Sequence, residues 1–229
     1  MKNFFKKLYI WQNVYIKNKY LLKRNSYSAF GEDIEIKKHF KRKRNGFYVD
    51  VGCYHPIKTS NTLLLHQNGW RGINIDINKL SIEFFNYCRP HDINLHLAIS
   101  NKKITKYYYQ KELSLLNSVK KKQANQAFQG KILTKKIKSQ SLNEVLDSSK
   151  FKNRKIDFLD IDAEGADFDV LKSLDFKRYN PKLISVEIMP KNLDVNKIDA
   201  KNSNIYKFLK RKKYQSIWSN KFSFIFKKN

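Results

Sequence analysis

The chain has 229 residues, 41% of them hydrophobic, and a formal net charge of +27; this length suffices for one α/β domain with a buried core. No run of about 20 apolar residues predicts a transmembrane helix, and the basic first residues lack the apolar core of a signal peptide. The two cysteines, Cys53 and Cys88, stand outside any metal-binding or disulfide pattern, so we expect a reduced, cytoplasmic protein.

The chain begins with a basic amphipathic segment, residues 1–25. Over 2–23, aromatic and aliphatic side chains recur at helical spacing among lysines, which predicts a helix. Such a helix either packs on its own domain, which we favour, or lies on an anionic membrane surface. The second alternative would give peripheral contact, through residues 1–24, with the inner face of the membrane. A further helix is predicted over 26–41, with Ser28 as its cap.

Strands and helices then alternate along the chain. The predicted strands are 46–52, 71–76, 93–99, 107–109, 132–134, 155–161, 182–188, 214–218 and 222–226. The predicted helices lie near 60–68, 79–88, 141–147, 167–174 and 202–212. Residues 105–138 break the alternation as an insertion, and the last two strands form a hairpin. This order predicts a doubly wound, mostly parallel α/β sheet of Rossmann-like type, with an antiparallel strand at its C-terminal end.

The first two strands run into acidic residues, as in α/β nucleotide-binding sites. The first passes through Asp50 to Gly52, where a residue without a side chain allows a positive φ, a close approach of a ligand to the backbone, or both. The second ends at Asp76, about 20 residues further on, where a carboxylate accepts hydrogen bonds from both hydroxyls of a ribose; a helix N-cap is the alternative. The pyrophosphate pattern Gly-x-Gly-x-x-Gly is missing. These residues favour a ribose-bearing cofactor without pyrophosphate, of which S-adenosylmethionine is the common one.

Further cofactor contacts are predicted around these strand ends. Asp50 would position the methionine end of the cofactor, directly or through the turn, or would only cap that turn. Cys53 and Tyr54 would contact the cofactor through their backbone. Ala98 and Ile99 end the third strand, where adenine would lie against apolar surface and backbone amides. Ordinary strand core is the alternative for these two residues.

Three acids, Asp160, Asp162 and Glu164, stand at the end of the strand over 155–161. Alternate residues of an extended chain face the same side, so we expect all three to converge where ligands bind in open α/β sheets. We assign Asp160 to the cofactor, and Asp162 and Glu164 to catalysis as candidate general bases. A pair of acids could instead hold a divalent metal, or an acid could cap the following helix.

Two further residues are candidates for contact with the substrate. His55 follows the glycine loop and would act as a base, a hydrogen bond within the loop being the alternative. Glu187 ends the strand over 182–188 and would contact the substrate.

At these motifs the chain resembles the FkbM family of S-adenosylmethionine-dependent methyltransferases, from about Ser26 to the C-terminus. The matching segments are 30–33, 46–52, 55–56, 60–62, 69–76, 89–90, 94–95, 98–100, 156–159, 161–162 and 164–165. Ala29 and Asp167 stand where the family usually has glutamine and glutamate. The order and spacing of the segments carry the resemblance. It implies a class I methyltransferase fold over 26–229 and methyl transfer, typically to a hydroxyl.

We therefore predict an S-adenosylmethionine-dependent O-methyltransferase. The resemblance implies an acceptor hydroxyl on a bacterial surface glycan or a nucleotide-linked sugar. The charge suggests a first alternative, methylation of nucleic acid. However, only 8 of the 47 basic residues are arginine, the residue that makes bidentate contacts with bases and phosphates. The abundant Lys, Asn, Ile, Phe and Tyr all have AT-rich codons, so we favour a compositional origin of the charge. The second alternative is a non-catalytic binding protein on the same fold.

Overall fold

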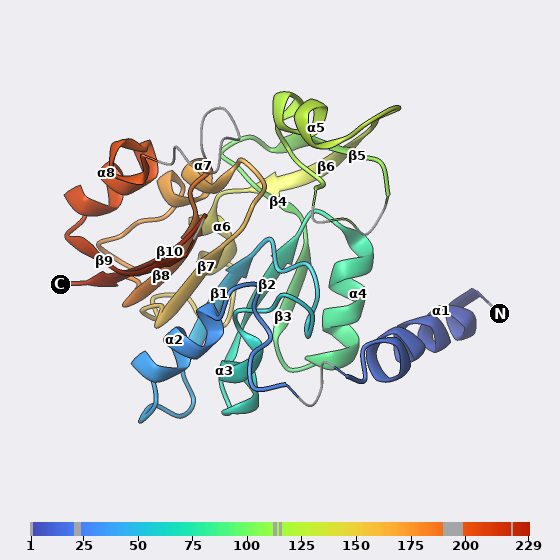
Figure 1. Ribbon diagram of the computed structural model, residues 1–229, viewed down its shortest axis with the longest axis horizontal. Helices are drawn as coiled ribbons and strands as arrows, with labels where there is room; N and C mark the ends of the chain where they lie inside the picture. The colour runs from blue at the N-terminus through green and yellow to red at the C-terminus, as the bar shows by residue number, and fades with distance from the viewer. Residues whose placement is uncertain (1, 21–23, 112–113, 115, 190–198, 221) are drawn as a thin grey trace.

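A seven-stranded sheet forms the centre of the computed structural model, which describes residues 2–20, 24–111, 114, 116–189, 199–220 and 222–229. The strand order is β3-β2-β1-β7-β8-β10-β9 (Figure 1). The strand bounds are β1 Phe47–Val51, β2 Arg71–Asp76, β3 Ile93–His96, β7 Phe158–Ile161, β8 Leu183–Glu187, β9 Tyr214–Asn220 and β10 Ser223–Lys228. From β3 to β8 all neighbours are parallel, whereas β10 runs antiparallel to both β8 and β9. The predicted mostly parallel α/β sheet with a C-terminal antiparallel strand is confirmed.

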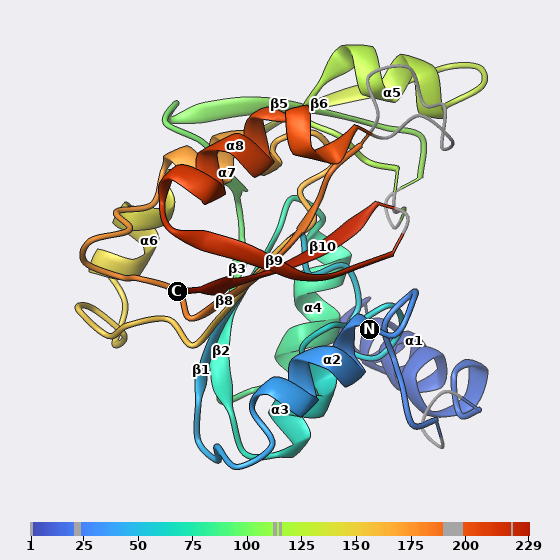
Figure 2. The ribbon, with the colours of Figure 1, turned by 60° about the vertical axis from the view of Figure 1, so that its left-hand side comes forward.

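Helices cover both faces of this sheet, which explains why its central strands are buried along their whole length. One face packs against α6 (Leu142–Asp147), α7 (Asp167–Lys172) and α8 (Asn204–Arg211) in the largest hydrophobic cluster. The other face packs against α2 (Glu32–His39) and α3 (Leu63–Gln67). On the same side, α4 (Lys79–Cys88) lies against β2 and β3 (Figure 2).

The insertion builds a second, smaller sheet. Its strand β5 (Ile104–Tyr109) pairs antiparallel with β6 (Leu133–Gln140), and β6 pairs parallel with β4 (Ala98–Ile99). The helix α5 (Lys121–Ala127) connects β5 to β6, in a polar, lysine-rich stretch for which we expected no helix.

The single strand predicted over 93–99 is therefore wrong. It divides into β3, in the large sheet, and β4, in the small one. Between them, the Leu97 N–H donates to the Asp76 carbonyl at 3.2 Å. The chain thus passes from one sheet to the other beside the end of β2.

At the N-terminus, α1 (Lys2–Trp11) continues into a π-helical segment, η1 (Gln12–Lys17). Ile10 and Val14 are buried and belong to a cluster with residues of α3 and α4. The helix therefore packs on its own domain through one face. None of the helices in the described part of the chain is long and apolar enough to cross a membrane.

The helix predicted over 26–41 begins later, at Glu32, because Asp33 holds the preceding residues in a loop. Its carboxylate accepts hydrogen bonds from the Ser26 hydroxyl, the Tyr27 N–H and the Ser28 hydroxyl, at 2.6, 2.6 and 2.8 Å. The Ser28 hydroxyl in turn accepts the Gly31 N–H at 2.9 Å. The predicted cap thus stabilises the loop before the helix.

Candidate active site

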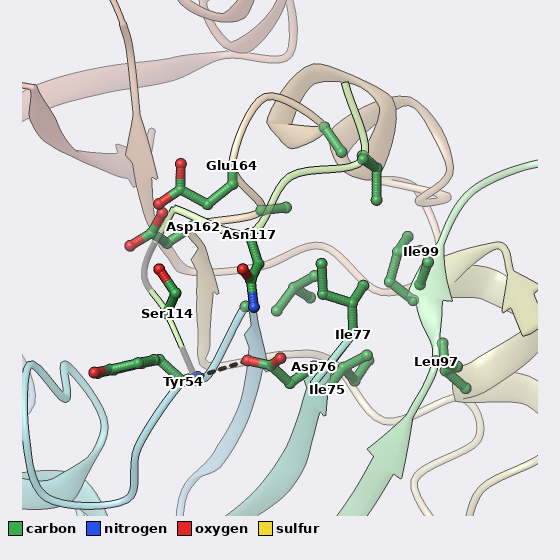
Figure 3. A pocket seen from close by; sticks show the side chains of 16 residues that line it. Tyr54, Ile75, Asp76, Ile77, Leu97, Ile99, Ser114, Asn117, Asp162 and Glu164 are labelled. Atoms are coloured by element: carbon green, nitrogen blue, oxygen red, sulfur yellow. Dashed lines mark hydrogen bonds between the residues drawn. The ribbon is translucent and has the colours of Figure 1, made fainter. Parts of the chain in front are cut away.

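A pocket opens at the carboxyl-terminal ends of β1, β2 and β7, between the large sheet and the insertion (Figure 3). Of the residues predicted from the sequence, it brings together Gly52, Tyr54, Asp76, Ala98, Ile99, Asp162 and Glu164. It does not include Asp50, Cys53, His55 or Asp160 in its wall. The predicted site is therefore partly assembled here, and the remaining residues have other surroundings.

Asp76 lies at the edge of the pocket, with both carboxylate oxygens held by backbone donors. Its Oδ2 accepts the Tyr54 N–H at 2.8 Å, and its Oδ1 accepts the Asn78 N–H at 2.6 Å. Burial raises its pKa to about 6, although the two hydrogen bonds act in the opposite direction. Each oxygen retains a second lone pair for a hydroxyl donor. The N-cap of α4 is Asn78, whose side chain accepts the Leu80 N–H at 2.9 Å, so Asp76 does not have that capping role.

The backbone conformation and packing at position 52 require glycine, independently of any ligand. Its φ of 86° is in the left-handed region, which favours glycine. A Cβ at this position would lie 1.8 Å from the carbonyl oxygen of Asp162. The ends of β1 and β7 therefore approach each other more closely than a side chain allows. The close approach that we predicted for a ligand is made first by the neighbouring strand.

The two ends of the pocket differ in chemistry. Ile77, Leu97 and Ile99 form an apolar wall at one end, and Asp162 and Glu164 lie at the other (Figure 3). Asp76 lies between the two ends.

The acidic end is crowded with carboxylates. Asp162 is exposed to the open pocket, yet the surrounding protein and the neighbouring Glu187 raise its pKa above the usual value. Burial and Glu187 raise the pKa of Glu164 to about 8. The pKa of Glu187 itself rises to about 7, chiefly through burial. Among the residues described, no three His, Cys, Asp or Glu side chains are arranged to hold a metal ion. The cluster therefore retains protons near neutral pH, and a cation entering the pocket would release them.

The insertion closes over the acidic end. The Ser118 hydroxyl donates to the Glu164 carbonyl at 2.6 Å, and Gln123 Nε2 donates to Glu164 Oε2 at 3.2 Å. Ser114, Asn117 and Val119 also line the pocket.

Sequence reasoning missed these contributions of the insertion because none of the residues belongs to a motif. The position of the insertion in the chain could have predicted them. It follows Ala98-Ile99, so it leaves the sheet at the edge where ligands bind.

Asp50 and Asp160 lie opposite each other on β1 and β7, beneath the loop over 53–62. The Asp50 carboxylate accepts the Thr62 hydroxyl at 2.8 Å, and Asp160 accepts Asn61 Nδ2 at 3.1 Å. Burial raises the pKa of Asp50 to about 6; burial and then Asp50 raise that of Asp160 well above its usual value. The direct cofactor contact predicted for Asp160 is not seen at the pocket wall. Both acids instead fix the loop that carries Tyr54.

Cys53 and His55 also point away from the pocket. The Cys53 side chain is buried, and its N–H donates to the Ile75 carbonyl at 3.2 Å. His55 Nδ1 accepts the N–H groups of Ile57 and Lys58 at 3.1 and 3.0 Å. Burial lowers the pKa of His55 to about 4. Its basic nitrogen is thus committed to the loop, which is the alternative that we kept for this residue.

Arg89, which is buried, secures the same loop from below. Its guanidinium donates to the Thr62 hydroxyl at 2.8 Å and to the Pro56 carbonyl at 2.7 Å.

We expect Arg89→Leu to lower the free energy of unfolding by about 3–5 kcal/mol, because buried acceptors and the carboxylate of Asp50 lose their cationic partner. Chemical denaturation measures this loss. The exposed Arg44 provides the control, since Arg44→Leu should change stability by less than about 0.5 kcal/mol; equal effects would contradict an anchoring role.

One comparison with known proteins, the match to a family model, identifies the family of the chain. The model of the methyltransferase FkbM domain matches residues 50–216, more than half of the chain, including the carboxyl-terminal ends of the strands that border the pocket. Among solved structures, the chain is similar to a TehB-like SAM-dependent methyltransferase from Corynebacterium glutamicum, with a TM-score of 0.42 and 10% identity over 95% of this chain and 97% of that one. None of the curated proteins matches it. The chain therefore belongs to the FkbM family of methyltransferases, enzymes that use S-adenosylmethionine.

Proposed function

We propose that the enzyme is an O-methyltransferase that acts on a hydroxyl of a glycan or of a nucleotide-linked sugar. One observation supports this most directly: two carboxylates with raised pKa values, Asp162 and Glu164, lie at the end of the pocket beyond Asp76. A sugar hydroxyl is a weak nucleophile until a base takes its proton. A carboxyl group with a pKa of about 8 is a stronger base than an ordinary one, so it suits that step near neutral pH.

The donor set of the pocket fits the cofactor of the family. Asp76 has free lone pairs for ribose hydroxyls, and the apolar wall of Ile77, Leu97 and Ile99 suits an adenine ring. The acidic end complements a positive charge. Bound there, S-adenosylmethionine supplies an electrophilic methyl group on a sulfonium. Its charge would stabilise the ionised carboxylates, which readies them to accept a proton.

The remaining steps belong to residues of this chain. Asp162 or Glu164 would accept the hydroxyl proton, so that the acceptor oxygen can take the methyl group as its bond to the sulfonium sulfur breaks. Ser118 and Gln123 hold the loop of Glu164 in place, and further residues of the insertion line the pocket beside it. Both cysteines are free, which agrees with the reducing cytoplasm, where we propose that the enzyme works.

The pH dependence of turnover tests the role of the acids. The general base must be ionised, so kcat/KM should rise with pH through the pKa of Glu164, about 8 before the cofactor binds. Glu187 is a cause of that raised pKa. We therefore expect Glu187→Gln to move the rising limb of the profile to lower pH. Asp169→Asn changes an acid of α7 that pairs with Lys120 and Lys172, and it should leave the limb in place. A limb that stays or moves upward in Glu187→Gln would count against this assignment.

The acceptor is tested with isotope-labelled S-adenosylmethionine and mass spectrometry. We expect label on a hydroxyl when nucleotide-linked sugars or surface polysaccharides are supplied. Label in RNA or DNA would support nucleic-acid methylation instead, and cofactor binding without turnover on any acceptor would support a binding protein.

A separate binding measurement addresses the positive charge. If that charge is mainly compositional, binding to random DNA or RNA should be weak and should vanish at about 0.15 M salt, because such binding depends on counterion release. Tight binding that persists at this salt concentration would contradict the compositional explanation.

A further inference from the structure

The N-terminal helix carries a row of large apolar side chains that stay exposed although the helix packs on the domain. The last of them, Tyr15, touches the domain through the ring of Tyr87 on α4, with centroids 6.4 Å apart. Phe4, Leu8, Trp11 and Tyr15 follow one another at i, i+4, i+7 and i+11, the spacing of one helix face. Their exposed fractions are 69%, 47%, 43% and 47%. We call these four residues the outer stripe. Such a row of large apolar side chains on one face marks an interaction surface.

The opposite face of the helix fixes its orientation. Ile10 and Val14 are 5% and 1% exposed and pack in the cluster with α3 and α4. The Lys6 ammonium also forms an ion pair with Glu83 on α4. Both ribbon views show α1 at the margin of the molecule beside α4 (Figures 1 and 2). The outer stripe therefore cannot rotate onto the domain without exposing Ile10 and Val14.

The charge around the outer stripe has a single sign. Residues 1–31 contain seven basic residues and no acidic one, whereas all 20 acidic residues lie in the other 198 (229 − 31). Lys7, Lys17 and Lys19 are exposed. At the average acid content of the chain, a segment of this length would carry about three acids. Aromatic side chains bordered by lysines match the interface of a bilayer that contains anionic lipid.

We propose that the outer stripe and its lysines dock the enzyme on the surface of a bilayer containing anionic phospholipid. The aromatic rings enter the headgroup layer, and the lysines contact lipid phosphates. A second copy of this chain is a poorer occupant, because it would bring two sets of seven basic residues together without an acid between them.

Docking also places the catalytic pocket relative to the membrane. Phe84 on α4 contacts the ring of Tyr9, with centroids 6.4 Å apart, and the ring of His55, at 4.9 Å. The next residue to His55 is Tyr54, which lines the pocket. The loop of the pocket thus lies one side chain away from the docking helix.

Vesicle binding by the full-length protein tests the proposal. We expect the protein to co-sediment with vesicles that mix phosphatidylglycerol into phosphatidylcholine, and not with phosphatidylcholine alone. Raising the salt concentration should weaken the binding, because it screens the charge contribution. Trp11 should report insertion by a blue shift of its fluorescence, since Trp70 is already buried and Trp218 packs against the cluster that contains Trp70. Trp11→Phe should remove that shift.

Variants separate the two parts of the surface while leaving Ile10 and Val14 intact. The double change Phe4→Ser and Leu8→Ser should lower the partition coefficient by about tenfold or more. Each of Lys7→Gln, Lys17→Gln and Lys19→Gln should lower it by about fivefold, from roughly 1 kcal/mol for each basic residue near an anionic surface.

Ile217→Ser on β9 is the matched control, because Ile217 is 46% exposed and lies on the edge strand at the other side of the molecule. It should bind vesicles as the parent protein does, and thermal unfolding should show that every variant is folded. Three results would each overturn the proposal: no binding to the mixed vesicles, equal binding to both kinds, or a dimer detected by light scattering that depends on the outer stripe while vesicles do not bind.

Discussion

Replacing Glu164 by glutamine, or Asp162 by asparagine, is expected to lower kcat and kcat/KM together by about 10²–10⁴-fold in at least one variant. Each amide keeps the size of the side chain but cannot accept the hydroxyl proton. The affinity for S-adenosylhomocysteine, which carries no sulfonium charge, should change little, since Asp76 and the apolar wall lie nearer the other end of the pocket. Steady-state kinetics on the identified acceptor, with calorimetry for the cofactor, separates the two effects.

Asp169→Asn is the control for this experiment. Asp169 lies on α7, close in sequence to Glu164, but its carboxylate pairs with Lys120 and Lys172 on the surface. Its turnover should stay near that of the parent enzyme. Near-normal turnover in both Asp162→Asn and Glu164→Gln would show that the base lies elsewhere. Loss of activity with a chelator and recovery with Mg²⁺ would instead identify the acids as metal ligands.

The second large effect is expected at Asp76. We expect Asp76→Ala to weaken binding of S-adenosylmethionine and S-adenosylhomocysteine by about 1.5–3 kcal/mol, because two charge-assisted hydrogen bonds to the ribose are lost. This corresponds to roughly 10- to 150-fold in the dissociation constant. Isothermal titration calorimetry on the folded variant measures it.

Asn78→Ala separates the loss of the ribose acceptor from local disorder. It removes the cap of α4, which costs about 1 kcal/mol of stability, but it leaves the carboxylate of Asp76 in place. Its affinity for the cofactor should fall by no more than about threefold, less than RT ln 10. Unchanged affinity in a folded Asp76→Ala variant would refute the ribose assignment.

The local signals in the sequence predicted the fold and half of the pocket. The strand-forming segments that end at Gly52 and Asp76 can be recognised from a few consecutive residues, and both residues line the pocket. The alternation of strands and helices likewise predicted the parallel sheet, because each element carries its own periodicity. The division of 93–99 between two sheets escaped this reasoning, since pairing partners far along the chain decide it.

By itself, the sequence determined where β1 and β2 end, the presence of the Asp76 carboxylate there and the face of the sheet on which the acids lie. Only the tertiary structure decided which acids reach the pocket. A period of two places Asp160 and Asp162 on the same face, but it does not say how far the covering loop extends. Asn61 of that loop covers Asp160, whereas Asp162 lies beyond it at the open edge of the sheet. The path of that loop depends on contacts between residues far apart in the sequence, here the hydrogen bonds of Arg89 to Thr62 and Pro56. No local sequence pattern predicts such contacts.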